Sequence, residues 1–307
     1  MSANNLIISI EGPTASGKTA LAVALAQHLE TGIVSSDSRQ CYKEMNIGTA
    51  VPTLDERKGI VHHMIHSHSV TDKLTAASFA TYAQRHIEAV LQERDSVVLV
   101  GGSPLYAEAI LYGLNELPEI DENIVSDTRA LSLEALQELI KTNDPQTYST
   151  IDLMNRRRLE RAAQVYLQTG EKLSELLNRP KKTPSYRCLR LRIDLPRERL
   201  YQRINQRVEE MYSAGLVEEA KAIWPNSSEI INATIGYYEL FGAFEQRYAL
   251  GHAKALIQQH SRNFAKRQLT WYRKAKTFVV LSESNAKQEA LNAIRGLLPG
   301  ENPLRVY

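Results

Sequence analysis

The stretch GPTASGKT at residues 12–19 decides the fold, because it lies between an apolar run, Leu6 to Ile10, and a segment rich in alanine and leucine. Two glycines let successive backbone N–H groups turn inward around an anion, and the N-terminus of a following helix adds positive potential. The pattern therefore predicts a phosphate-binding loop between a strand and a helix. A glycine-rich turn with an incidental lysine is the weaker interpretation, because both flanking elements are present.

Side chains of this loop should hold a di- or triphosphate. Lys18 is expected to reach the outer phosphates, and the Thr19 hydroxyl is expected to ligate Mg²⁺. The predicted diphosphate-binding residues are Gly12, Thr14, Ala15, Ser16, Gly17, Lys18 and Thr19.

The composition is that of an ordinary soluble protein, with a formal net charge of only +2 over 307 residues. Any contact with nucleic acid must therefore come from clustered lysines and arginines. Cys41 and Cys188 match no zinc or redox spacing, which indicates two unpaired thiols in a reducing compartment. With no basic leader and no apolar run of about 18 residues, we expect a cytoplasmic protein without a membrane span.

Apolar runs and helical periodicity alternate along the chain. They predict strands at 33–36, 97–100, 189–195 and 278–281, and helices at 19–29, 76–94, 105–112, 197–214 and 253–274. This alternation predicts an α/β fold, a doubly wound parallel sheet of the P-loop NTPase-like type.

The segment 117–184 shows no strand pattern and is interrupted by prolines, which indicates a helical insertion domain. The predicted core domain then comprises residues 1–116 and 185–307. The helical stretch 197–251 could belong to the core or pack with the insertion.

Polar motifs follow two further strands, and the carboxyl ends of parallel strands share one crevice. Asp37 could act there as a general base or assist Mg²⁺, or it could be a plain helix N-cap. Ser103, after Gly101 and Gly102, could bind substrate or cap the helix beginning near Pro104. An ATPase usually has an acidic Mg²⁺ ligand where this chain has the glycines, so the loop could hold a diphosphate that departs in another reaction.

Two stretches are strongly basic, residues 156–161 and residues 262–276. Each could bind a phosphate backbone or be a solvated helix face, and the first could also be the lid of a kinase. Phe264, Trp271 and Tyr272 could stack on unpaired bases, although core packing is the commoner role of such aromatics. His62 and His66 would share a helix face, but apolar neighbours and the lack of a nearby acidic ligand disfavour a metal site there.

Several ordered motifs resemble those of the tRNA dimethylallyltransferases, over nearly the whole chain. The matching blocks are residues 12–19, 36–42, 47–50, 62–63, 100–102, 158–162, 234–237 and 266–271. The resemblance implies transfer of a dimethylallyl group from dimethylallyl diphosphate to N6 of the adenosine adjoining the 3′ side of the tRNA anticodon, with Mg²⁺ on the diphosphate. We expect the protein to act as a monomer.

The resemblance also implies residue roles. Asp37 would accept the N6 proton, residues 14–19 would cradle the diphosphate, and residues 38–40 would read the flipped adenine. We also predict catalytic roles for Lys18, Thr19 and Ser103. The implied tRNA contacts are Asp37, Ser38, Arg39, Gln40, Ser103, Arg157, Arg158, Leu159, Glu160, Arg161, Lys266, Arg267, Gln268, Trp271 and Arg273.

The chain departs from the family pattern at Val51 and Tyr238, where lysine is usual, and at Ser103-Pro104, where Thr-Gly is usual. The usual Pro-Asn-Asp before the arginine block is replaced by Leu153-Met154-Asn155. A small-molecule kinase using ATP, and an RNA-binding module without turnover, are the rival hypotheses.

Overall fold

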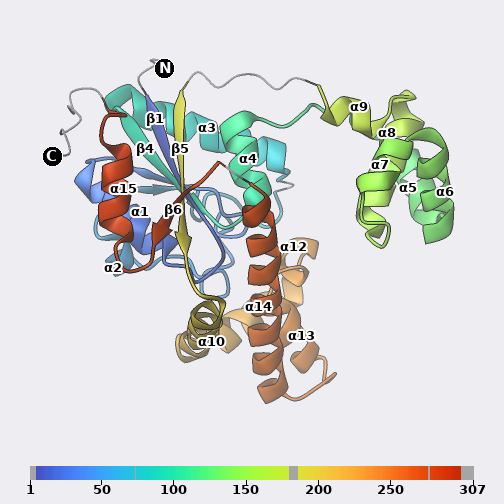
Figure 1. Cartoon of the computed structure of the whole chain (residues 1–307). Helices are drawn as coiled ribbons and strands as arrows, with labels where there is room; N and C mark the ends of the chain where they lie inside the picture. The colour runs from blue at the N-terminus through green and yellow to red at the C-terminus, as the bar shows by residue number, and fades with distance from the viewer. Residues whose placement is uncertain (1–4, 73, 180–185, 276, 299–307) are drawn as a thin grey trace. The chain divides into compact units, whose positions relative to one another are not determined.

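The computed structural model describes residues 5–72, 74–179, 186–275 and 277–298 (Figure 1). The chain divides into two compact units, Met1–Leu111 with Pro184–Tyr307, and Tyr112–Thr183. Residues 197–251, for which the sequence left two placements open, belong to the unit that contains the sheet.

The first unit is built on a six-stranded sheet in the order β3-β2-β4-β1-β5-β6. Its strands are β1 (Leu6–Glu11), β2 (Ile33–Ser35), β3 (His62–His63), β4 (Ser96–Gly101), β5 (Arg187–Asp194) and β6 (Val279–Ser282). All of their pairings are parallel, for example Ile8 opposite Val98 on one side and Leu189 on the other. The prediction of a parallel α/β sheet is thus confirmed.

Burial explains why the sequence identified the central strands β1 and β4. Every residue of β1 and β4 is buried, and strands covered on both faces have continuous apolar sequences. The sequence did not predict β3, whose two residues are the polar His62 and His63. The helix face suggested for His62 and His66 is therefore wrong, because pairing of Ile33 with His62 makes this segment an edge strand.

Helices cover both faces of the sheet. Those of this unit are α1 (Lys18–His28), α2 (Leu54–Arg57), α3 (Ala76–Glu93), α4 (Pro104–Tyr112), α10 (Arg197–Ser213), α11 (Leu216–Ile223), α12 (Glu229–Asn232), α13 (Tyr237–Phe244), α14 (Leu250–Lys274) and α15 (Ala286–Ile294). Helices α1 and α15 share one apolar core with alternate sheet residues such as Ile8, Val98 and Leu191. Helix α3 packs against β2 and β4 and contacts α4 through Phe79 and Tyr106.

Helices α10 to α14 lie beyond the carboxyl ends of the strands (Figure 1). The 25-residue α14 packs against α10 and α13, which joins these helices into one layer.

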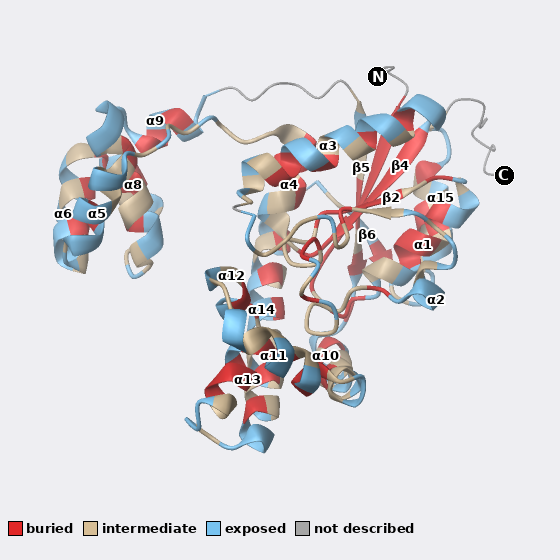
Figure 2. Cartoon of the chain, turned by 180° about the vertical axis from the view of Figure 1, so that it is seen from behind, coloured by how far each residue is buried: buried red, intermediate tan, exposed pale blue. Residues whose placement is uncertain are grey.

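The second unit is a small helical domain with its own core (Figure 2). Its described residues form α5 (Glu122–Ala130), α6 (Leu133–Asn143), α7 (Pro145–Thr150), α8 (Arg156–Thr169) and α9 (Leu173–Leu177). Leu136, Ile140 and Leu176 are in its core.

Asp144 joins two helices of this unit although it is only 4% exposed. Its carboxylate accepts hydrogen bonds from the backbone N–H and hydroxyl of both Thr147 and Ser174. Burial acts to raise the pKa of Asp144, but the four hydrogen bonds together outweigh burial and hold this pKa below its usual value.

Cys41 and Cys188 form no disulfide. Within the described ranges, no helix has the length and apolar character needed to cross a membrane.

Candidate active site

The predicted phosphate loop connects the carboxyl end of β1 to the first turn of α1. Gly12 and Gly17 have φ angles of 146° and 91°, which glycine adopts without steric cost, and Ala15 has a φ of 61°. Gly17 is the N-cap of α1 and gives the helix no side-chain cap. The first N–H groups of α1 are therefore suited to binding the oxygens of an anion.

Lys18 lies at the start of α1, and its ammonium group donates a 2.6 Å hydrogen bond to the carbonyl of Pro13. Burial and then the nearby Arg207 lower the pKa of Lys18 to about 7, while Asp37 acts in the opposite direction. An anionic ligand beside Lys18 would stabilise the charged form of its ammonium group.

Arg207 is a second cation at the loop, and no sequence motif pointed to it. It projects from α10, and its Nη1 donates to the Thr14 hydroxyl at 3.2 Å. Burial is the main factor that lowers the pKa of Arg207, and the charge of Asp37 is among those that raise it. Since the carboxylate of Asp37 acts on both Lys18 and Arg207, these three groups share one electrostatic environment.

Two buried polar atoms also mark the loop as a ligand site. Among the described residues, Ser16 Oγ and Arg192 Nε have no hydrogen-bond partner. Both residues lie next to Gly12, with Ser16 Oγ 3.4 Å and Arg192 Cγ 3.9 Å from the position of a Cβ built on that glycine. Unpaired buried donors are costly, so this arrangement favours occupation by a hydrogen-bond acceptor such as a phosphate oxygen.

Asp37 follows β2 and is half-buried. Its Oδ1 accepts from the backbone N–H of Arg39 at 2.9 Å and from that of Gln40 at 3.4 Å. The helix N-cap interpretation is wrong, because residues 38–41 form a turn and not a helix. The local hydrogen bonds orient the carboxylate at the strand end, as in an Asx turn.

Ser38 and Ser103 meet although 65 positions separate them. Their hydroxyl oxygens are 3.1 Å apart, and the N–H of Ser38 makes a long 3.5 Å contact with Ser103 Oγ. The Ser103 carbonyl accepts from Ala107 in the first turn of α4. Ser103 therefore joins the carboxyl ends of β2 and β4.

Gly101, the last residue of β4, and the following Gly102 are explained by lack of space for a side chain. A Cβ at Gly101 would lie 2.1 Å from Ser36 Oγ, and one at Gly102 would lie 2.8 Å from the amide nitrogen of Gln268 and 3.3 Å from the carbonyl of Gly12. No carboxylate side chain fits at this position. The missing acidic ligand is therefore a consequence of close packing between β4, the phosphate loop and α14.

Gln268 was predicted to contact tRNA, but the structure buries its side chain against the phosphate loop. It is 4% exposed, accepts from the N–H of Thr14 at 3.1 Å and donates to the carbonyl of Gly102 at 2.5 Å. Both ends of its amide thus connect α14 to the phosphate loop. Of the nearby aromatics, Tyr272 is in the core at 1% exposed, whereas Phe264 is 36% exposed.

The remaining predicted residues of α14 lie at or near the surface. Lys266, Arg267 and Arg273 are exposed, and Trp271 is half-buried with the Arg190 guanidinium 5.9 Å from its ring.

The loop at residues 46–50 is held by residues that sequence reasoning missed. Glu219 accepts from the N–H groups of Ile47 and Gly48 at 2.8 and 2.9 Å, and from the Tyr237 hydroxyl at 2.7 Å. A Cβ at Gly48 would lie 2.5 Å from the Tyr237 ring, so only glycine fits there. The signal was present as two separate motifs, 47–50 and 234–237, but nothing in the sequence showed that they touch.

Gln40 fastens the same loop from the other side. Its amide donates to the carbonyls of Thr49 and Ala50 at 3.3 and 3.0 Å. The side-chain amide of Gln40 therefore holds the loop at residues 46–50 in place.

In the helical unit, some residues of the arginine motif of α8 are exposed and others are buried. Arg157 and Arg158 are exposed. Leu159 is 0% exposed, so its prediction as a tRNA contact is wrong, because it lies on the inward face of α8. Glu160 pairs with Arg156 at 2.8 Å, and Arg161 donates to the carbonyl of Pro118 at 3.1 Å.

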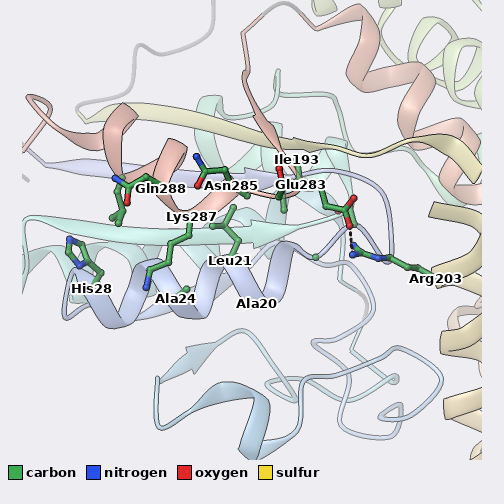
Figure 3. Close-up of a pocket in the computed structure, with 15 residues that line it drawn as sticks. Ala20, Leu21, Ala24, His28, Ile193, Arg203, Glu283, Asn285, Lys287 and Gln288 are labelled. Atoms are coloured by element: carbon green, nitrogen blue, oxygen red, sulfur yellow. Dashed lines mark hydrogen bonds and ion pairs between the residues drawn. The ribbon is translucent and has the colours of Figure 1, made fainter. Parts of the chain in front are cut away.

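A groove of about 630 Å³ borders the loop at Ser16 and Gly17 (Figure 3). It lies between α1 and the start of α15, and Arg203 and Glu283 form an ion pair at its edge. Neither Asp37 nor Ser103 lines it, so this groove is separate from the place where Ser38 and Ser103 join the ends of β2 and β4.

Comparison with known proteins identifies the family. The model of the IPP transferase family matches residues 40–275. This chain belongs to the IPP transferase family.

Individual members of this family are similar over almost their whole length. A tRNA dimethylallyltransferase from Flavobacterium johnsoniae is 39% identical over 298 residues, which cover 94% of this chain and 96% of that protein. The tRNA isopentenylpyrophosphate transferase of Bacillus halodurans has 30% identity and a TM-score of 0.72, with 97% of this chain and 98% of that chain covered. The corresponding Staphylococcus epidermidis structure has 32% identity and a TM-score of 0.67, covering 94% and 97%. These relatives confirm the P-loop NTPase-like fold.

Proposed function

We propose that this protein transfers a dimethylallyl group from dimethylallyl diphosphate to N6 of the adenosine adjoining the 3′ side of the anticodon in tRNA, with release of diphosphate. The observation that carries the proposal is the family match over residues 40–275, together with a carboxylate and a diphosphate cradle in one electrostatic environment. A small-molecule kinase is disfavoured, because the similar proteins are named as tRNA prenyltransferases.

The phosphate loop stabilises the leaving group. As the bond between the allylic carbon and the diphosphate oxygen loosens, negative charge builds on the diphosphate. Lys18, Arg207 and the N–H groups at the start of α1 are placed to bind that charge, and such electrostatic stabilisation is usually the largest catalytic contribution.

Magnesium fits this arrangement as a cofactor shared with the diphosphate. Among the described residues, no group of three histidine, cysteine, aspartate or glutamate residues could hold a metal alone. Thr19 offers an oxygen ligand beside the cradle, which suits a hard cation that keeps most ligands from phosphate and water. When bound, Mg²⁺ would neutralise charge on the diphosphate.

Asp37 acts on the acceptor. Its Oδ1 is held by the backbone N–H groups of Arg39 and Gln40, in the turn that follows β2. The target adenine must leave its stack to reach that point, and Ser38 and Ser103 supply hydroxyl groups there. Asp37 then orients N6 and accepts its proton as the carbon–nitrogen bond forms.

Exposed cations would bind the tRNA backbone, with Arg157 and Arg158 on α8 and Lys266, Arg267 and Arg273 on α14. We place the reaction in the cytoplasm and expect a monomer.

The decisive experiment incubates the protein with total tRNA, Mg²⁺ and dimethylallyl diphosphate, followed by mass spectrometry of the nucleosides. We expect one dimethylallyl mass on the adenosine next to the anticodon. An RNA-binding module would add no mass. Transfer of a labelled phosphoryl group from ATP to an acceptor, with no prenyl product, would overturn the proposal in favour of a kinase.

A further inference from the structure

A buried ion pair directly precedes the phosphate loop, and the steps described above do not use it. Glu11, the last residue of β1, is 0% exposed, and Arg190 of β5 is 4% exposed. Nε and Nη2 of Arg190 donate to the two carboxylate oxygens of Glu11, each at 2.8 Å. Well-packed apolar residues are often as stable as such a pair, because both charges lose their hydration on burial. Stability alone therefore does not explain why the chain has these charges beside the loop.

Arg190 also connects this pair to the carboxyl end of α14. Its Nη1 donates to Glu108 of α4 at 3.1 Å and to the hydroxyl of Thr277, just beyond α14, at 3.2 Å. Its guanidinium lies 4.3 Å from the centre of the Phe278 ring and 5.9 Å from that of the Trp271 ring. Paired hydrogen bonds and ring stacking both need the planar guanidinium in one orientation. Arg190 therefore holds β1, α4 and the end of α14 in one fixed arrangement.

The buried face of α14 contacts the phosphate loop next to this pair. Gln268 and Tyr272 lie four residues apart on α14 and therefore share that face. Gln268 accepts from the N–H of Thr14 and donates to the carbonyl of Gly102. The Tyr272 hydroxyl makes a long 3.5 Å contact with the same carbonyl. Burial, and then the carboxylate of Glu11, raise the pKa of Tyr272, so this hydroxyl keeps its proton at neutral pH.

Contacts around α14 thus hold the first part of the phosphate loop at two points. Arg190 holds the side chain of Glu11, and Gln268 holds the backbone of Thr14 three residues later. Gly12 lies between these points with a φ of 146°, and it has no side chain that could support the segment. The two contacts therefore determine where residues 12–14 lie.

Both cations of the diphosphate cradle are hydrogen-bonded to residues 12–14. The Lys18 ammonium donates to the carbonyl of Pro13 at 2.6 Å, and Arg207 donates to the Thr14 hydroxyl at 3.2 Å. A displacement of this segment would therefore move both cations relative to the diphosphate. Because anion binding depends on several donors that converge on one ligand, even a small displacement should weaken it.

We propose that Glu11 and Arg190 are positioning residues for the diphosphate cradle. Their pairing fixes α14 against β1, so that Gln268 holds residues 12–14 in the conformation that binds diphosphate. The pair acts through Gln268, without touching the diphosphate itself. This inference rests on the proposed function, because it assumes that the loop holds a diphosphate.

The test measures the affinity for inorganic diphosphate with Mg²⁺ by titration calorimetry, and the thermal unfolding of the same proteins. Glu11→Leu and Arg190→Met each leave one buried charge without its partner, so both should lower the unfolding temperature. The double variant Glu11→Leu, Arg190→Met replaces the pair by apolar side chains and should regain most of that stability. We expect it nevertheless to bind diphosphate about 10-fold more weakly than wild type. Wild-type affinity in the double variant would mean that the pair is only structural, and would overturn the proposal.

Arg190→Lys tests orientation against charge. Lysine keeps the positive charge beside Glu11 but can neither form the paired hydrogen bonds nor stack in the same way on Phe278. We expect Arg190→Lys also to bind diphosphate about 10-fold more weakly. Full affinity in this variant would show that charge neutralisation is sufficient, and the positioning role would be wrong.

A double-mutant cycle with Gln268→Ala tests the route through α14. If the pair acts through Gln268, Arg190→Lys should cause little further loss of diphosphate affinity in a protein that already carries Gln268→Ala. Losses that add fully would contradict this route.

Arg247→Met is the matched control. Arg247 also combines an ion pair, with Glu245 at 2.9 Å, and an aromatic ring, that of Tyr238 at 5.6 Å, but it is exposed. Its replacement should leave diphosphate affinity unchanged, and an equal loss in this variant would count against the proposal. If the wild-type protein binds no diphosphate, the proposed function fails together with this inference. That result differs from variants that bind as tightly as wild type, which would refute the inference alone.

Discussion

At the scale of single residues, the proposed chemistry depends on Asp37. Its Oδ1 is oriented by the N–H groups of Arg39 and Gln40, so an alanine would remove the base and leave the phosphate loop in place. We expect Asp37→Ala to lower turnover about 100-fold or more, with little change in diphosphate binding. Steady-state kinetics with a stem-loop substrate check this, and near-normal turnover would exclude Asp37 as the base.

Arg207 is predicted to act on dimethylallyl diphosphate, whereas Asp37 acts on the acceptor adenosine. Because its guanidinium contacts Thr14 of the loop, its charge should stabilise the diphosphate both before and during departure. Arg207→Ala should weaken diphosphate binding and lower turnover, each by about 10-fold or more. Titration calorimetry with inorganic diphosphate measures the first effect. Arg199→Ala, on an exposed part of the same helix, is the control, and equal behaviour of the two variants would contradict the assignment.

At the scale of elements, the connection of α7 to α9 through Asp144 should govern the stability of the helical unit. In Asp144→Asn, an NH₂ group replaces one carboxylate oxygen. This NH₂ group then faces N–H and hydroxyl donors of Thr147 and Ser174 and cannot accept their hydrogen bonds. We expect this unit to lose about 1–3 kcal/mol of unfolding free energy at neutral pH. Hydrogen exchange of the amides of α7 and α9 measures the loss.

The pH dependence of that loss has a definite sign. The folded-state pKa of Asp144 is lower than the unfolded value of about 3.9. Its contribution to stability is therefore fully present above pH 4 to 5 and disappears as pH falls through the folded-state pKa. The difference between wild type and Asp144→Asn should shrink on acidification, and a difference that grew would refute this explanation.

At the scale of the whole molecule, tRNA binding should depend on exposed cations carried by both units. The net charge of +2 provides no strong general field, so local groups such as Arg157 and Arg158 must neutralise phosphates. The double variant Arg157→Ala, Arg158→Ala should weaken binding to all tRNAs alike. It should also reduce the slope of log K against log salt by about 1 to 2.

Binding measured at several salt concentrations checks this prediction. Lys141→Ala removes an exposed cation from α6 of the same unit and is the control. A salt slope equal to that of wild type in the double variant would mean that these arginines do not contact phosphate.

The sequence by itself determined the features that depend on short spacings. The loop at 12–19, the buried strands and the family motifs are each specified within about ten residues, because glycine positions and hydrophobic periodicity act locally. The sheet, the phosphate loop and the family were therefore predictable.

Only the tertiary structure decided which side chains face one another. It placed Arg207 beside Thr14, Glu219 and Tyr237 under the loop at Gly48, and it turned Leu159 and Gln268 inward. These contacts join segments up to 254 positions apart, as Gln268 and Thr14 show. Their geometry comes from the packing of helices on the sheet, and a linear pattern of residue types does not contain it.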